Sequence, residues 1–399
     1  MPAAAPDLPA DFTPLLSERH VALAVSGGSD STALMRLVHD FARGRHPDLR
    51  ISVLTVDHGL RAASAAEALE VGRWAAELGL VHHVLSWEGP KPRTGLQAKA
   101  RAARYGLLAQ WCRSHGADLL LTGHTLDDQA ETVLMRLMRT SSPASLAGIP
   151  QHGEWDGVRL FRPLLAVRRQ ALRDYLSSLD QGWIEDPSNE DAGFERVRLR
   201  QSLPALARSG VTPERLARLA AAGARTSALL EQAAGRWLRL WLREEEQGVC
   251  QLPARQFLGL PEALQQRVLA LVIGHYGGGG HEPEAEEFRR LARWVAAGKG
   301  RRTLGGALVG RRKNDFWVTR EAARIAPEPL KVPDSGEALW DNRFLVEAPP
   351  GSLVTPAGGR GQPLPPGVPA FAGRAMPWIE PPEGAEGRVK AVFLRLCGP

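Results

Sequence analysis

Short apolar runs alternate with longer amphipathic stretches in the first half of the chain. The runs are rich in Val, Ile and Leu, which favours buried strands, and they are Val21–Val25, Ile51–Val56, Val81–Leu85 and Leu119–Thr122. The stretches have the apolar spacing of helices, and they are Thr32–Phe41, Ala65–Leu78, Leu96–His115, Asp127–Arg139 and Val167–Leu179. Strands separated by helices predict βαβ units. We therefore expect an α/β fold with a Rossmann-like parallel sheet that helices cover on both faces.

The pattern becomes mainly helical after about residue 208. Thr212–Glu246, Leu260–Tyr276 and Glu284–Ala297 are amphipathic, and Thr303–Arg320 holds short runs that suit a hairpin. Residues 349–388 are rich in Pro and Gly, a composition that disfavours regular structure. We predict an N-terminal extension (1–17), a catalytic domain (18–207), a mainly α-helical substrate-binding domain (208–328) and a Pro/Gly-rich region (329–399), for which partial disorder is one expectation.

Composition narrows the class of protein. No apolar run approaches the roughly 18–20 residues of a membrane span, and no basic segment followed by an apolar stretch marks a secretory signal, so we expect no membrane partner. The three cysteines, Cys112, Cys250 and Cys397, form no CxxC pair, which argues for a reducing cytoplasm. A net charge of +6 permits an acidic partner such as RNA. The basic residues are almost all Arg, which suits phosphate contacts, although a GC-rich genome also favours Arg over Lys.

The first strand is followed by SGGSDS, which then opens a helix. The motif consists of Ser26, Gly27, Gly28, Ser29, Asp30 and Ser31. Glycines let the backbone approach a ligand closely, and a helix N-terminus offers free N–H groups to an anion, so this order predicts a phosphate-binding loop. It lacks the GK dipeptide of a Walker A loop. A Gly-Ser turn with Asp30 as a helix cap is the alternative.

A second polar segment, TGHTLDDQAET, ends the fourth strand and opens a helix. It contains His124, Asp127 and Asp128. Because carboxyl ends of parallel strands line the ligand crevice, we expect this segment to face SGGSDS. His124 is a candidate to contact phosphate or activate a nucleophile. Acidic residues also cap helices, so a structural role for the two aspartates stays open.

Two further groups are weaker. Asp57 and His58 end the second strand, where they are expected to meet the nucleotide, although a strand-to-loop turn explains them equally well. Arg101 and Arg104 share a face of a predicted helix and suit a triphosphate or an RNA backbone. A solvated basic helix face is the alternative.

These motifs together resemble the tRNA(Ile)-lysidine synthetase family of the PP-loop superfamily. SGGSDS, VDHGLR, ARAARY, TGHTLDDQAET, RPLL and WIEDPSN occur in the family's order over about residues 18–205. The resemblance implies a ligase that uses ATP to adenylate carbon 2 of the wobble cytidine in the CAU anticodon of tRNA(Ile). L-lysine then displaces AMP and leaves lysidine.

The resemblance also implies residue roles. Ser26–Ser31, Asp57 and His58 would bind ATP, and Asp30 would bind Mg²⁺. The catalytic set would be Asp30, Arg101, His124, Asp127 and Asp128, and the tRNA or base contacts would be Glu185, Asp186, Asn189, Arg196 and Arg200. The oligomeric state stays open, with a homodimer as one option.

Another PP-loop enzyme, such as a tRNA thiolase, is the alternative function. Such enzymes commonly need a CxxC pair or two cysteines at the crevice. Only Cys112 lies in the predicted catalytic domain, which argues against sulfur transfer.

Overall fold

The computed structural model describes residues 8–59, 64–89, 96–139, 143–185, 193, 195–278, 283–358, 360, 364, 368–385 and 387–397. The chain divides into two compact units, Met1–Ser227 and Ala228–Pro399. The boundary falls within the helix α7 (Pro213–Trp241). Each unit has its own core and is described by itself.

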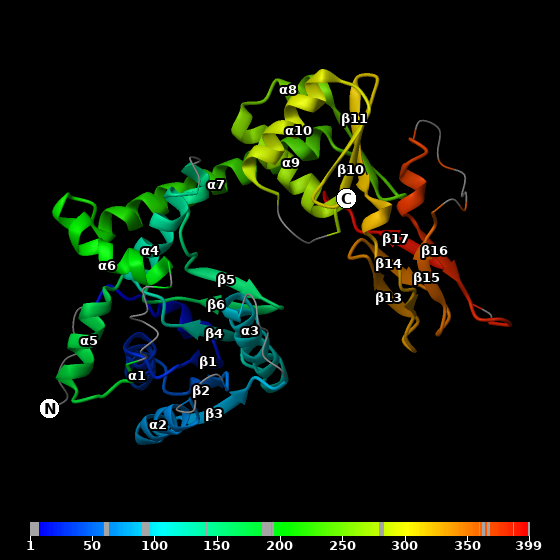
Figure 1. The fold of residues 1–399 in the computed structure, drawn as a ribbon. Coiled ribbons are helices and arrows are strands. Elements are labelled where there is room, and N and C mark those ends of the chain that lie inside the picture. Colours follow the sequence, from blue (N-terminus) through cyan, green and yellow to red (C-terminus); the bar gives the residue numbers. More distant parts are fainter. Residues whose placement is uncertain are drawn as a thin grey trace. The chain divides into compact units, whose positions relative to one another are not determined.

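The first unit is built on one sheet (Figure 1). Its strands are β1 (His20–Ala24), β2 (Arg50–Asp57), β3 (Val81–Ser86), β4 (Leu119–Thr122), β5 (His152–Trp155) and β6 (Val158–Phe161). Its other helices are α1 (Ser29–Arg45), α2 (Ser64–Glu77), α3 (Leu96–His115), α4 (Leu126–Leu137), α5 (Arg169–Ser178) and α6 (Glu195–Arg208), with short 3-10 helices η1 (Thr13–Ser17) and η2 (Pro143–Leu146).

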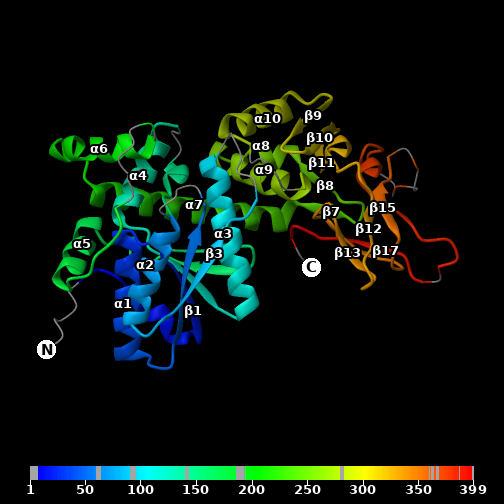
Figure 2. The same ribbon diagram turned by 60° about the horizontal axis from the view of Figure 1, so that its bottom comes forward.

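The strand order is β3-β2-β1-β4-β6-β5, and only β5 runs antiparallel to its neighbour. Side chains alternate across the sheet, so each strand feeds two cores. Val21 and Leu23 of β1 pack in one core with α1, α2 and α5, whereas Ala22 packs in the other with α3. Figure 2 shows α3 apart from α1 and α2. The predicted α/β fold with a parallel sheet covered on both faces is thus confirmed.

The β5–β6 hairpin was absent from the predicted elements. All four residues of β5 are exposed, so the strand has no apolar alternation to reveal it. Its turn contains Asp156 and Gly157 at φ 50° and 76°, the positive values that a tight two-residue hairpin turn requires. An Asp-Gly pair between short runs is the local signal that remained in the sequence.

The second unit combines helices with antiparallel strands. Besides the end of α7 it holds α8 (Ala254–Leu258), α9 (Glu262–Tyr276) and α10 (Ala285–Ala297), with 3-10 helices η4 (Ala322–Arg324) and η5 (Ala372–Ala375). Its strands are β7 (Arg243–Glu245), β8 (Val249–Pro253), β9 (Arg301–Leu304), β10 (Ala307–Arg312), β11 (Asp315–Arg320), β12 (Leu330–Lys331), β13 (Glu337–Trp340), β14 (Phe344–Glu347), β15 (Leu353–Pro356), β16 (Pro377–Glu380) and β17 (Lys390–Phe393).

The expected helices of the second unit share their core with a five-stranded antiparallel sheet, β7-β8-β11-β10-β9. The hairpin expected within 303–320 is β10 with β11. Two three-stranded sheets, β12-β15-β16 and β13-β14-β17, use described residues of the Pro/Gly-rich region. The proposed domain limits at 207/208 and 328/329 stay predictions. No helix in the described ranges is both long and apolar enough to cross a bilayer.

Candidate functional site

The SGGSDS loop connects β1 to α1. Gly27 has φ +87°, and a Cβ there would lie 2.5 Å from Cδ1 of Ile184. Gly28 is the N-cap of α1, and no side chain caps the helix. The Ser31 hydroxyl accepts a hydrogen bond from the Ser26 amide at 3.1 Å and donates to the Gly28 carbonyl at 3.0 Å, which shapes the loop. An uncapped helix N-terminus behind a Gly turn is chemically suited to a phosphate.

The segment after β4 lies directly against this loop. A Cβ on Gly123 would be 2.9 Å from the Asp30 carbonyl oxygen, so only Gly allows the two backbones to approach this closely. The next turn is a capping box. Thr125 is the N-cap of α4, and the Asp128 carboxylate accepts hydrogen bonds from the Thr125 amide and hydroxyl, both at 2.8 Å. The structure thus brings together the two segments that the strand order predicted to meet.

One guanidinium joins the acidic residues of both segments. Arg169, the first residue of α5, donates from Nε to Oδ2 of Asp30 at 2.8 Å and from Nη2 to Oδ1 of Asp128 at 3.1 Å. Its Nη1 lies 3.7 Å from Oε1 of Glu131. Its backbone amide also donates to Oδ2 of Asp127 at 2.8 Å. Arg169 therefore holds the carboxylates of the β1 and β4 ends in one cluster.

Glu131 is fully buried beside this cluster. Nε of Arg200 donates to its Oε1 at 2.7 Å, which links α6 to α4. The other carboxylate oxygen, Oε2, is buried and has no hydrogen-bond partner within the described ranges. Asp127 instead faces Arg168, whose Nη2 lies 3.3 Å from its Oδ1. The acidic face of α4 is therefore almost entirely engaged with arginines of α5 and α6.

Burial sets the protonation of the cluster. It raises the pKa of the Asp30 carboxyl above its ordinary value, against the effect of Arg169. Burial also raises the pKa of Glu131, although Arg200 opposes the change. Burial alone would raise the pKa of Asp128, but Arg169 and the hydrogen bonds from Thr125 hold it below its ordinary value.

His124 is neutral at physiological pH. Burial lowers its pKa to about 4, and the charges of Arg162, Arg101 and Arg104 act in the same direction. Its Nδ1 lies 2.9 Å from the Thr122 hydroxyl. A neutral imidazole among arginines can accept a proton or a hydrogen bond.

The weaker candidates are placed as follows. The guanidinium of Arg101 lies 5.0 Å from the ring centroid of Tyr105, and that of Arg104 lies 5.3 Å from it. Asp57 closes the end of β2, since its Oδ1 accepts from the Gly59 amide at 2.8 Å and the Ser64 hydroxyl at 2.7 Å. The His58 ring packs edge-on against Trp87, with centroids 5.9 Å apart. This contact gives the His58 ring a structural environment, and its expected contact with the nucleotide stays a prediction.

The WIEDPSN segment is fixed to the phosphate-binding loop by its second residue. The Ile184 amide donates to the Gly27 carbonyl at 2.9 Å. Glu185 accepts from Nε1 of Trp183 at 2.8 Å and from Nη2 of Arg173 at 3.1 Å. Asp186 and Asn189 lie outside the described residues. Arg196 lines a pocket beside α4.

Arg169 lies outside the sequence motifs. Glu131 and Ile184 lie within TGHTLDDQAET and WIEDPSN, but neither was among the candidate site residues. A signal for Arg169 was present, because two consecutive arginines, Arg168 at the N-cap and Arg169, open α5. Cations at a helix N-terminus oppose its dipole and therefore need an anionic partner. Ile184 gave no signal, because its contacts with the loop come from a residue far along the chain.

Known proteins resemble this chain over most of its length. The family model of the PP-loop domain matches residues 7–206. The chain is 40% identical over 338 residues to the tRNA(Ile)-lysidine synthase of Ruegeria pomeroyi, covering 83% of this chain and 77% of the relative. It is 48% identical over 319 residues to that of Methylobacterium nodulans, covering 77% of this chain and 90% of the relative.

A solved structure, the U34-tRNA thiolase NcsA from Methanococcus maripaludis, is a distant likeness. It has 18% identity and a TM-score of 0.45, covering 52% of this chain and 73% of that one. A likeness this distant carries no argument about activity.

Proposed function

The chain belongs to the tRNA(Ile)-lysidine synthase family, and on that premise we propose that it joins L-lysine to the wobble cytidine of tRNA(Ile) at the expense of ATP. Its PP-loop domain belongs to an ATP-binding family, so the nucleotide follows from membership. The wobble base is that of a CAU anticodon.

The reaction has two steps. The oxygen on carbon 2 of cytidine attacks the α-phosphorus of ATP, and pyrophosphate leaves. The lysine amine then attacks carbon 2, the carbon–oxygen bond breaks with AMP as leaving group, and the amine loses a proton. Adenylation is needed because a carbonyl oxygen is a poor leaving group. The released proton passes to solvent, and His124, whose neutral imidazole can accept a hydrogen bond, is our candidate to orient the lysine amine.

The nucleotide would use the Gly-rich turn. The uncapped amides of α1 suit its phosphates, and a Cβ on Gly28 would meet only the Ser26 hydroxyl, at 3.8 Å, which leaves room for close approach. Asp57 and His58 at the end of β2 are proposed to contact the nucleoside, and Arg101 the phosphates or the transition state.

Mg²⁺ fits this donor set as a partner of the nucleotide. No group of three or more His, Cys, Asp or Glu in the described ranges could hold a metal by itself. Asp30 with phosphate oxygens is the common arrangement for Mg²⁺ in nucleotide sites. Bound there, the ion would neutralise charge on the departing pyrophosphate.

The remaining candidates divide between the acidic cluster and the substrate. Asp127 and Asp128 hold the arginines of the cluster in place. Glu185, Asp186 and Asn189 are proposed to lie near the base, and Arg196 and Arg200 near the RNA backbone. We place the reaction in the cytoplasm, where tRNA and ATP meet. A homodimer remains one option for the oligomeric state.

Sulfur transfer is disfavoured by the one cysteine of the catalytic unit. Burial raises the pKa of the Cys112 thiol to about 12, so it is a poor nucleophile near neutral pH. Cys112 is a residue of α3, and it lies in the core with Leu108 and Ala109 of the same helix.

The observation that best supports the proposal is the cluster in which Arg169 ties Asp30 to Asp128, because it unites two motifs that the family shares. The test is transfer of labelled lysine to a tRNA(Ile) transcript with a CAU anticodon, with AMP release followed in parallel. Asp30→Asn should abolish transfer, whereas Asp48→Asn, an exposed change in the loop after α1, should leave it unchanged.

Two outcomes would change the proposal. AMP release without lysine incorporation would mean that the acceptor is wrong while ATP cleavage stands. Wild-type transfer by Asp30→Asn would remove Asp30 from the chemistry.

A further inference from the structure

A pocket of about 370 Å³ lies beside α4 in the first unit. Thr132, Met135 and Arg136 line it from α4 and Arg139 from the turn that follows, and Ser145 of η2 and Arg196 of α6 complete it. The three α4 residues follow helical spacing, so they form one continuous face. Helices α4 and α6 pack together (Figure 1, Figure 2).

The pocket carries a surplus of positive charge. Arg139 is paired with Glu195 at 2.5 Å, and Nη1 of Arg136 donates to the Ser145 carbonyl at 3.4 Å. Arg196 has no ion pair within the described ranges. The three lining guanidiniums and the neighbouring Glu195 carboxylate together carry a charge of +2. A guanidinium fork matches the oxygens of a phosphate.

A hydroxyl donor adds to this charge. Oγ1 of Thr132 is buried and has no hydrogen-bond partner in the described part of the chain. A buried hydroxyl without a partner is costly unless a ligand or water completes it. The lining therefore offers both charge and an unused hydrogen-bonding group.

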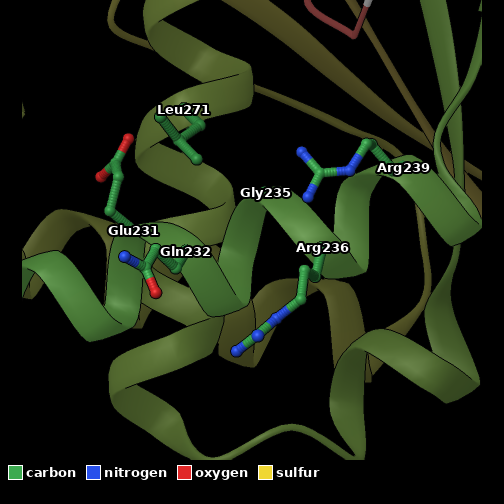
Figure 3. Close-up of a pocket in the computed structure, with 6 residues that line it drawn as sticks. All are labelled: Glu231, Gln232, Gly235, Arg236, Arg239 and Leu271. Atoms are coloured by element: carbon green, nitrogen blue, oxygen red, sulfur yellow. The ribbon is translucent and has the colours of Figure 1, made fainter.

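A second basic pocket, of about 490 Å³, makes a useful contrast (Figure 3). It lies in the other unit between α7 and α9. Its carboxylate, Glu231, is already paired with Arg267. Arg236 and Arg239 point in different directions in Figure 3, so they do not converge on one ligand atom.

The α4 pocket also has a fixed place relative to the reacting groups. Thr132 directly follows Glu131, and Arg196 lies one helical turn before Arg200, the partner of Glu131. Thr132, Met135 and Arg136 are four, seven and eight positions after Asp128, so they lie on the same face of α4. A ligand in the pocket therefore sits one to two helical turns along this face from the acidic cluster.

We propose that the α4 pocket binds a backbone phosphate of the RNA substrate, next to the nucleotide that is modified. The inference rests on the proposed function, because it takes the substrate to be tRNA. Phosphate contacts position an RNA without reading its sequence, so the pocket would hold the wobble nucleotide in register with the catalytic cluster.

The test measures how the affinity of the full-length protein for the tRNA transcript depends on salt. Arg196→Gln and Arg136→Gln should each lower the slope of log affinity against log salt, and the double variant should lower it by about 0.7, the share of one phosphate contact. ATP affinity should stay unchanged. Arg73→Gln is the matched control, since Arg73 is an exposed α2 residue paired with Glu70, and its slope should equal that of the wild type.

Thr132→Val tests the hydroxyl without changing charge. It should weaken binding several-fold at every salt concentration and leave the slope unaltered. Thermal melting checks that each variant folds. Arg136→Lys, which keeps the charge, serves if Arg136→Gln does not fold, and it should restore most of the slope.

Other outcomes would overturn the proposal. A loss of ATP or pyrophosphate affinity with an unchanged RNA slope would assign the pocket to the nucleotide. Equal effects in Arg73→Gln would reduce the result to overall charge, and unchanged slopes in both variants would leave the pocket without a phosphate. If the wild type binds the transcript but transfers no lysine, the proposed function fails while the slopes still report on the pocket.

Discussion

At the scale of single residues, the site is a balance between buried charges. Asp30, Asp128 and Glu131 are held by Arg169, and Arg200 gives Glu131 a second partner. Removing one partner from a buried ion pair typically costs about 3–5 kcal/mol, because the other charge is left uncompensated. The arginine of this cluster therefore supports both the folded state and the geometry of the reacting groups.

Replacing Arg169 should show both roles. We expect Arg169→Gln to lower the rate of lysine transfer by about 10²-fold or more, because Asp30 and Asp128 lose their common anchor. Arg169→Lys should keep part of the activity, since an ammonium supplies charge but cannot bridge two carboxylates equally well. Steady-state kinetics and urea denaturation measure the two effects. Arg43→Gln, an exposed change on α1, is the control, and an Arg169→Gln protein with wild-type rates would contradict this view.

His124 should make the protein sensitive to acid. Its pKa is about 4 in the folded protein, against 6.5 for an ordinary histidine. Between these values the unfolded chain binds the extra proton, so stability falls as the pH is lowered from 6.5 towards 4. The full difference corresponds to about 3 kcal/mol. Denaturant titrations at pH 7 and pH 4.5 should show a smaller loss in His124→Gln than in the wild type. Equal losses would mean that His124 is not held neutral.

Motif residues that are contiguous could be predicted, whereas their partners could not. Ser26 to Ser31 stand between a strand and a helix, so the local order indicates a phosphate loop. Arg169 is 139 positions from Asp30 and 41 from Asp128, and no local pattern connects them. Only folding brings these residues together.

At the scale of elements, the start of α1 depends on two glycines with different tasks. Gly27 takes a positive φ and lies against Ile184, whereas Gly28 has an ordinary φ of −66° and open space beside it. The first glycine therefore serves the fold of the loop. The backbone conformation of Gly28 does not require a glycine, so we expect its small size to serve the approach of a ligand.

Substituting these glycines should separate stability from binding. Gly27→Ala should destabilise the protein by about 1–3 kcal/mol, because it combines backbone strain with a clash against Ile184. Gly28→Ala should leave the melting temperature nearly unchanged but raise the KM for ATP, since its methyl group would occupy the approach of a phosphate. Differential scanning fluorimetry and ATP titrations provide the measurements. A Gly28→Ala protein with unaltered KM would argue that the phosphates lie elsewhere.

Regular elements followed the hydrophobic pattern where both faces are buried. β1, β2 and β4 were predicted to within a residue or two, because their apolar runs feed two cores. β5 was missed because it is an exposed edge strand, which needs no apolar side chains. In the second unit the β10–β11 hairpin was expected from the local pattern. The pairings of β8 with β11 and of β14 with β17 join strands distant in the chain, which no local pattern indicates.

At the scale of the whole molecule, the chain has two units with separate cores. Units with their own cores can unfold as separate cooperative steps. We expect calorimetry to resolve two transitions. ATP with Mg²⁺ should raise the melting temperature of the first unit only. At a hundredfold excess of ligand over Kd, its free energy of unfolding should increase by about 2.7 kcal/mol.

The Asp30→Asn variant identifies the transition. It should lose the shift with ATP while the other transition stays in place. A single transition that moves as a whole with ATP would mean that the two units unfold together.

The residues that complete the site are synthesised long after the loop that they complete. β1 emerges early, yet its register with β4 pairs Val21 with Leu119, and Gly27 receives the amide of Ile184 later still. Arg200, the partner of Glu131, arrives after that. The phosphate-binding loop therefore lacks some of its native contacts until nearly half of the polypeptide has been synthesised. Nascent chains shorter than about 200 residues should therefore carry the phosphate-binding sequence without a competent site, and we expect them not to bind ATP.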